Sequence, residues 1–141
     1  MSDARPAAAP RGPADRPMSP HLQVWRWHIT MATSILHRAT GIALYGGALI
    51  LAGWAVSLAM GPAAYGFYRG LLANPLGQLA LFGLTVCLFY HLANGVRHLW
   101  WDAGKGFEPK VADMTGAAAI AFGVVAAVAI WLVALLGGAV G

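Results

Sequence analysis

The chain has 141 residues, of which 59 % are hydrophobic and only 10 % are charged. Ordinary soluble domains have roughly 45–50 % hydrophobic and about 25 % charged residues, so this chain has too few polar side chains to cover a water-facing globule. The nine Lys and Arg residues form no run, which excludes a basic patch for nucleic acid. A single cysteine, Cys87, excludes an intramolecular disulfide and an all-cysteine metal site.

Three long stretches of the chain carry no charge. No Asp, Glu, Lys or Arg lies between Arg38 and Arg69, between Arg69 and Arg97, or from Thr115 to the end. Each stretch exceeds the ~20 residues that a helix needs to cross a bilayer, and no alternation typical of a β-barrel is visible. We therefore expect an all-α membrane protein whose three transmembrane helices run up, down and up. Their approximate ranges are 32–60, 75–101 and 114–138.

The remaining segments predict a tail and two connections. Proline and alanine dominate residues 1–20, which predicts a flexible cytoplasmic tail, and residues 21–141 form the three-helix anchor. Residues 61–66, with two glycines and a proline, predict a turn between the first two spans. Residues 102–110 predict a short polar loop before the third span.

Basic residues are distributed unevenly across the expected spans. Most Lys and Arg residues lie before the first span or in the second loop, whereas the opposite side has only Arg69. By the positive-inside rule, the N-terminus and residues 102–113 lie in the cytoplasm and the C-terminus lies outside. The expected protein crosses its membrane several times, and its expected location is a bacterial inner membrane with the C-terminus in the periplasm.

The start of the first span carries polar side chains. Ser34, His37, Arg38 and Gly41 have the i, i+3, i+4, i+7 spacing that places them on one face of a helix. One interpretation assigns no function to this face: Arg38 extends to lipid phosphates, and Ser34 makes a hydrogen bond to its own backbone. The functional interpretation is a polar pocket, reached from the lipid, for a ligand with carbonyl or carboxylate oxygens.

The end of the second span carries two histidines. His91, Gly95 and His98 share one face, and His91 lies six residues before Arg97, about 9 Å deeper in the membrane at ~1.5 Å per residue. His91 either makes an interhelical hydrogen bond or ligates a metal or haem, because imidazole is the commonest metal ligand. His98 is either an ordinary interfacial residue or part of the same site. No internal pair of facing histidines is evident, so a bis-histidine haem would need a ligand from another chain.

Two motifs in register resemble a known family. The run RPMSPHL from Arg16, together with SILHRATG from Ser34, resembles the N-terminal signature of the cytochrome b556 subunits of succinate dehydrogenase, respiratory complex II. The run HLANGVRHLWWD from His91 to Asp102 is similar to the second signature of that family, H-x3-G-x-R-H-x3-D. The resemblance extends from about residue 16 through the third span.

The resemblance implies a role for each matching residue. His91 corresponds to the axial ligand of haem b, and a second anchor subunit supplies the other histidine. Ser34 and Arg38 match positions that line the ubiquinone site, with Trp27 as a candidate for its wall, and His37 and Arg38 are placed to meet haem propionates. The remaining residues of the second signature are expected to support the subunit interface: Arg97, His98 and Asp102.

The implied function is that of a membrane anchor that takes part in electron transfer from succinate to ubiquinone. Its expected partners are the second anchor subunit, an iron–sulfur subunit, a flavoprotein subunit and membrane lipid, and the chain itself holds none of the succinate chemistry. Two alternatives stay open. One is the anchor of a quinol-oxidising fumarate reductase or another haem b complex. The other is a non-catalytic membrane assembly protein, which would need neither His91 nor the Ser34–Arg38 face.

Overall fold

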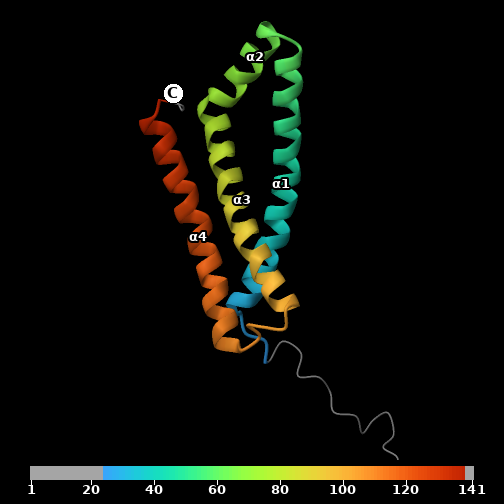
Figure 1. The fold of residues 1–141 in the computed structure, drawn as a ribbon, viewed down its shortest axis with the longest axis vertical. Helices are drawn as coiled ribbons and strands as arrows, with labels where there is room; N and C mark the ends of the chain where they lie inside the picture. Colours follow the sequence, from blue (N-terminus) through green and yellow to red (C-terminus); the bar gives the residue numbers. More distant parts are fainter. Residues whose placement is uncertain (1–23, 139–141) are drawn as a thin grey trace, which may run out of the picture.

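A computed structural model describes residues 24–138 of the chain, so the tail expected over residues 1–20 lies outside the described residues. The described part is all-helical, and its four helices run up and down the long axis of the molecule (Figure 1). Their bounds are α1 Ile29–Ala59, α2 Pro62–Ala73, α3 Pro75–Asp102 and α4 Pro109–Leu136. Three of them, α1, α3 and α4, are long and apolar enough to cross a membrane. The predicted all-α fold with three transmembrane helices is confirmed.

Two of the long helices begin earlier than the charge pattern predicts. The helix α1 starts at Ile29 rather than near residue 32, and the side chain of His28 caps it by accepting a hydrogen bond from the backbone of Thr30 at 3.4 Å. The helix α4 starts at Pro109 rather than near residue 114. Proline suits the first turn of a helix because its missing N–H would have no partner there. The apolar run therefore marks the part of α4 suited to the membrane and not its first polar turn.

The segment after α1 is a helix, so the prediction of a turn over residues 61–66 is wrong beyond Gly61. Gly61 has a φ of +102°, a conformation that glycine adopts readily, and α2 begins at the following Pro62. The hydroxyl of Tyr68 donates to the carbonyl of Ile50 at 2.7 Å, which joins α2 to α1. A Cβ added at Gly53 would lie 2.8 Å from that hydroxyl, so a larger residue there would displace the ring of Tyr68.

The most extensive helix contact in the described part joins α3 to α4. The residues that α4 buries are all small: Ala112, Gly116, Ala119, Gly123 and Ala127. They recur at helical spacing and let two backbones approach closely, as small residues do in membrane helix pairs. A Cβ at Gly123 would lie 2.7 Å from the Cβ of Tyr90, so the fit is tightest at that point.

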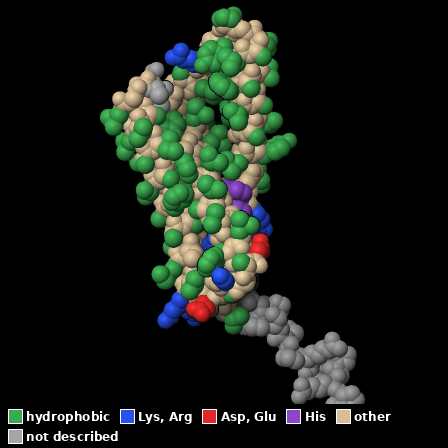
Figure 2. All heavy atoms as spheres, viewed as in Figure 1, with side chains coloured by type: hydrophobic (Ala, Val, Ile, Leu, Met, Phe, Trp, Pro, Cys, Tyr) green, Lys and Arg blue, Asp and Glu red, His purple; other side chains and the backbone are tan. Residues whose placement is uncertain are grey.

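The surface of the bundle is that of a membrane protein. Large apolar side chains are exposed along all the long helices, and hydrophobic side chains cover most of the face seen in Figure 2. Acidic side chains lie only toward the lower end of that face, where α1 begins and α3 meets α4. Since hydrocarbon replaces water around such a surface, the exposed apolar residues carry no cost in a bilayer.

Candidate functional site

Three imidazole rings come together between α1 and α3, toward the charged end of the bundle. The rings of His37 and His91 stack with centroids 3.9 Å apart and planes 13° from parallel, and His37 also stacks on His98 at 4.9 Å. Histidine side chains are visible on this side of the molecule in Figure 2. The sequence showed no facing pair of histidines deep in the membrane, and this stack of His91 on His37, near the start of α1, was not expected. The sequence interpretation compared residues within each helix and had no register between α1 and α3.

The stacked pair does not form a two-ligand metal site. Two imidazoles that share one metal ion each point a nitrogen at it, whereas His37 and His91 present their ring faces to each other. Among the described residues, no group of three or more His, Cys, Asp or Glu side chains is arranged to hold a metal ion. A metal site on His91 with three or more such ligands would therefore need ligands from outside the described residues.

His91 is half-buried and one of its ring nitrogens is engaged. Its Nδ1 lies 3.1 Å from the hydroxyl oxygen of Thr40 on α1. A Cβ added at Gly41 would lie 3.2 Å from Cε1 of His91, so glycine gives the ring its space against α1. Within the described residues Nε2 makes no hydrogen bond, and it remains available to a ligand. Sequence reasoning missed Thr40, although it follows His37 by three residues and shares its helix face.

His98 has a similar arrangement on the same face of α3, about two turns closer to its C-terminal end. Its Nδ1 donates to the backbone carbonyl of Asn94 at 2.8 Å, and its ring meets Trp101 edge-on with centroids 5.2 Å apart. A carbonyl oxygen only accepts, so the proton of a neutral His98 lies on Nδ1 and the lone pair on Nε2. His98 is thus a second imidazole with a free nitrogen, but it lies within a turn and a half of the end of α3.

Ser34 and Arg38 lie on one exposed face of α1, as their spacing predicts. The guanidinium of Arg38 donates through Nη2 to the hydroxyl of Ser34 at 3.2 Å and through Nε to its carbonyl at 3.3 Å. The structure does not join Trp27 to them: it lies before α1, is 62 % exposed, and meets Trp25 edge-on at 5.8 Å. The arrangement can offer a hydroxyl and a cation to a ligand outside this chain.

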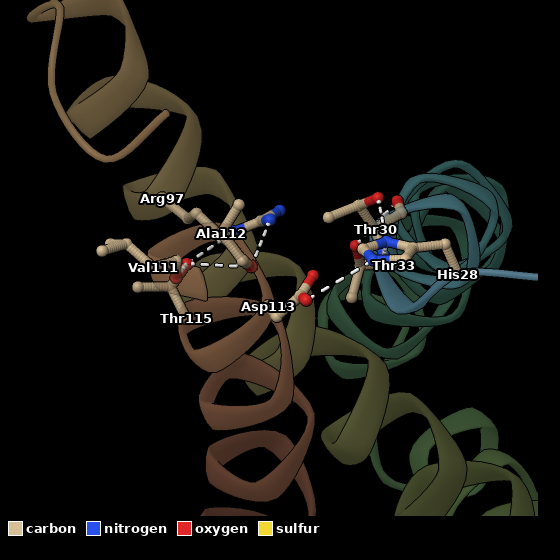
Figure 3. Close-up of polar contacts among 8 residues, drawn as sticks. All are labelled: His28, Thr30, Thr33, Arg97, Val111, Ala112, Asp113 and Thr115. Carbon is tan, nitrogen blue, oxygen red and sulfur yellow. Dashed lines mark hydrogen bonds and ion pairs between the residues drawn. The ribbon is translucent and has the colours of Figure 1, made fainter. Parts of the chain in front are cut away.

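Arg97 faces α4 rather than the histidines. Its guanidinium is nearly buried and donates to the Thr115 hydroxyl at 3.0 Å, the Ala112 carbonyl at 2.8 Å and the Asn94 side chain at 3.3 Å. It also lies 3.9 Å over the ring of Trp101. Figure 3 shows Arg97 reaching toward the start of α4. A buried cation with three hydrogen-bond acceptors holds two helices together. Arg97 therefore stabilises the packing of α3 against α4.

Two further polar contacts fix the start of α1, and sequence reasoning missed both. His28 lies 3.4 Å from the carboxylate of Asp113 on α4 (Figure 3). The buried hydroxyl of Tyr90 donates to the carbonyl of Thr33 at 2.7 Å. Nothing in a single helix pattern signals these pairs, because each joins two helices. Asp102 is exposed at the end of α3 and makes no side-chain hydrogen bond or ion pair among the described residues.

Fold and site together define a class of protein. The chain is a membrane protein with three spanning helices, and its histidine cluster and its Ser34–Arg38 face lie toward one end of the bundle. A buried polar junction around Arg97 holds the same end together. Toward this end the described part presents an imidazole nitrogen without a hydrogen bond at His91, and an exposed hydroxyl and guanidinium at Ser34 and Arg38.

Comparisons with known proteins give the family. The family described as succinate dehydrogenase/fumarate reductase transmembrane subunit matches residues 13–130. A succinate dehydrogenase cytochrome b556 subunit from Paracoccus denitrificans is 41 % identical over 81 % of this chain and 88 % of its own length. The cytochrome b556 subunit of Rickettsia felis is 36 % identical, over 83 % and 91 %. The mitochondrial cytochrome b560 subunit of Mus musculus is 40 % identical, over 79 % and 67 %.

The chain therefore belongs to the succinate dehydrogenase/fumarate reductase transmembrane subunit family. The resemblance to cytochrome b556 subunits of succinate dehydrogenase, expected from the two signatures, is confirmed.

Proposed function

We propose that this chain is the haem b-binding membrane anchor of a succinate dehydrogenase and that it contributes to the reduction of ubiquinone. The observation that carries the proposal is the environment of His91. Its imidazole is half-buried between two apolar helices, Nδ1 is engaged by Thr40, and Nε2 has no hydrogen-bond partner in the described part of the chain. A neutral imidazole with one nitrogen held and the other free is the usual arrangement of a metal-ligating histidine.

The surrounding residues fit haem b. His91 would supply one axial ligand and the second anchor subunit the other. The Nδ1 atom of His37 is buried with no partner in the described structure, and a haem propionate would satisfy it. Arg38 is exposed beside it in sequence and has guanidinium N–H groups beyond those that reach Ser34. When bound with two imidazole ligands, haem b supplies one-electron transfer rather than oxygen binding.

Ser34 and Arg38 are the proposed ubiquinone contacts. The Ser34 hydroxyl can donate to a quinone carbonyl, and Arg38, whose guanidinium lies 3.2 Å from that hydroxyl, can stabilise the negative charge that develops on a quinone oxygen during reduction. Both side chains are exposed near the charged end of α1, where protons are available from water. Trp27 is proposed as part of the wall of this pocket, which the partner subunits would complete.

The proposed setting is a four-part complex in a bacterial inner membrane. The second anchor subunit would cover part of the exposed apolar surface, lipid the rest, and an iron–sulfur and a flavoprotein subunit would carry the succinate chemistry. The excess of basic residues favours a cytoplasmic N-terminus and a periplasmic C-terminus. The Ser34–Arg38 face would then lie toward the cytoplasm, on the side from which the soluble subunits deliver electrons.

The test replaces each candidate ligand in the complex purified through a tag on this chain. We expect His91→Leu to lose the low-spin haem b bands from the reduced-minus-oxidised optical spectrum. His98→Leu is the matched control, because His98 also has its Nδ1 engaged within this chain, and it should keep those bands. A His91→Leu complex with full haem content and an unchanged spectrum would contradict the proposal.

A further inference from the structure

We propose that Thr40 is a positioning residue that sets the tautomer of His91. In this arrangement the Thr40 hydroxyl oxygen accepts a hydrogen bond from Nδ1–H of His91. The lone pair of the imidazole then lies on Nε2. The inference rests on the proposed function in one respect, since it concerns the ligating ability of His91 toward haem iron. Thr40 lies within the SILHRATG run, but the resemblance assigned it no role.

The direction of the hydrogen bond follows from the contacts of a single hydroxyl. The Thr40 hydroxyl oxygen lies 2.8 Å from the carbonyl of Leu36 and 3.0 Å from the carbonyl of His37. Carbonyl oxygens only accept, so the one proton of Thr40 is directed to the backbone of α1. Toward His91, at 3.1 Å, the same oxygen is left as an acceptor. Nδ1 of His91 therefore carries a hydrogen and donates it to the Thr40 hydroxyl oxygen.

Other parts of α1 hold the ring in the same orientation. The ring of His37 stacks on that of His91 at 3.9 Å, and the missing side chain of Gly41 gives Cε1 of His91 its space. Thr40 is β-branched and its hydroxyl is held by the preceding turn, so its side chain has little rotational freedom. One turn of α1 thus fixes the plane of the imidazole, its tautomer and the direction of its free nitrogen.

This contact has a consequence for the electronic properties of a bound metal. An imidazole that donates a hydrogen bond through its second nitrogen is a more basic ligand than one without an acceptor. A more basic ligand favours the oxidised, more positive iron. Loss of the Thr40 hydroxyl should therefore raise the reduction midpoint potential of the haem while leaving the iron ligated.

The experiment uses Thr40→Val in the assembled complex, because valine keeps the shape of threonine and lacks the hydroxyl. We expect low-spin haem to be retained, its midpoint potential to rise above that of the wild type, and its electron paramagnetic resonance g-values to shift. Thr40→Ser restores a hydroxyl and should return both quantities to their wild-type values. These readouts depend on the electronic state of the iron and not on turnover.

Thr85→Val is the matched control. The Thr85 hydroxyl donates to the carbonyl of Leu81 at 2.8 Å and accepts from the indole of Trp131 at 3.1 Å, so it also links two helices through a backbone-held hydroxyl. Its loss removes a comparable contact from a different part of the bundle. We expect the midpoint potential and g-values of this variant to match those of the wild type.

The outcomes separate this inference from the proposed function. Thr40→Val with full haem content and unchanged potential and g-values would overturn the positioning role and leave His91 as a ligand. Loss of haem in Thr40→Val is compared with Thr40→Ser, which keeps the hydroxyl at this position. Haem restored in Thr40→Ser supports the inference, and haem absent from both variants overturns it, because the hydroxyl would then not be what holds the imidazole. Haem retained in His91→Leu would instead defeat the proposed function.

Discussion

His37 and His91 have different surroundings although their rings stack 3.9 Å apart. His91 has Nδ1 engaged by a hydroxyl, whereas the buried Nδ1 of His37 has no partner in the described structure. A buried polar atom without a partner is costly, so a partner for His37 Nδ1 would stabilise this arrangement. The two environments are those required by the proposed roles, with His91 as a haem ligand and His37 as a donor to a propionate.

The Ser34–Arg38 pair gives a prediction at the residue scale. Ser34→Ala should lower succinate-driven ubiquinone reduction by roughly two- to tenfold, since it removes one hydrogen bond. Arg38→Leu should lower it by roughly a hundredfold, because a developing negative charge loses its cation. Electron transfer from succinate to a soluble artificial acceptor should persist in both. Arg69→Leu, the same change at an exposed arginine of α2, is the control and should leave ubiquinone reduction intact.

Normal ubiquinone reduction in both variants would show that Ser34 and Arg38 only bond each other on the surface of α1. The quinone site would then be formed by partner subunits. A fall in both assays together would instead indicate that the complex fails to assemble around the changed anchor, and would remove support for direct contact with ubiquinone.

At the scale of the elements, the sequence predicted those features that one helix determines alone. The charge-free stretches predicted α1, α3 and α4 as spans, because the thickness of a bilayer sets the length of an apolar helix. The helix α2 was not predicted. Its 12 residues are too few for a span, and its glycines at 66 and 70 resemble turn residues. Proline at its start and packing of Tyr68 on α1 favour the helix instead.

For the site, too, the sequence predicted only the features that lie within one helix. The common face of Ser34 and Arg38 follows from helical spacing within α1. Three other features depend on how two helices pack: the contact of Thr40 with His91, the stack of His37 on His91, and the hydrogen bonds of Arg97 to α4. Spacing within one helix carries no information on the register between helices, so these contacts needed the structure.

The contact of α3 with α4 gives a prediction at the element scale. In Gly123→Ala the added Cβ would lie 2.7 Å from the Cβ of Tyr90 and 3.0 Å from its backbone, so the helices must separate. We expect a loss of stability of about 1–3 kcal/mol, seen as a lower thermal unfolding midpoint of the complex.

The matched control is Gly70→Ala in α2, where an added Cβ meets nothing within 4 Å. Alanine has the higher helix propensity, by about 1 kcal/mol, so this variant should be as stable as the wild type or slightly more stable. An unfolding midpoint of Gly123→Ala at or above that of Gly70→Ala would contradict close packing of α3 on α4.

On the scale of the whole molecule, polar function is concentrated at one end of an apolar bundle. The histidine stack, the Ser34–Arg38 face and the junction around Arg97 lie toward the end where α1 begins and α3 meets α4 (Figure 1). Much of the remaining surface exposes apolar side chains. In the proposed function, the available imidazole nitrogen of His91 would make half of a bis-histidine site, and a second membrane subunit would supply the other half.

Orientation is tested with cysteines introduced at the two ends, in a Cys87→Ser background. Lys105→Cys lies between α3 and α4, and Arg69→Cys lies in α2 near the opposite end. We expect a membrane-impermeant maleimide to label position 69 in intact spheroplasts and position 105 only after permeabilisation. The reverse pattern would place the N-terminus outside and move the Ser34–Arg38 face away from the cytoplasmic subunits.

The most direct test of the account is the optical spectrum of the wild-type complex, purified through a tag on this chain and reduced with succinate. We expect the reduced-minus-oxidised spectrum to show a low-spin b-type haem in proportion to the flavin that copurifies. That result requires this chain to connect succinate oxidation with a haem in the membrane. A complex that retains its flavoprotein and iron–sulfur subunits and oxidises succinate, yet contains no haem, would contradict the account.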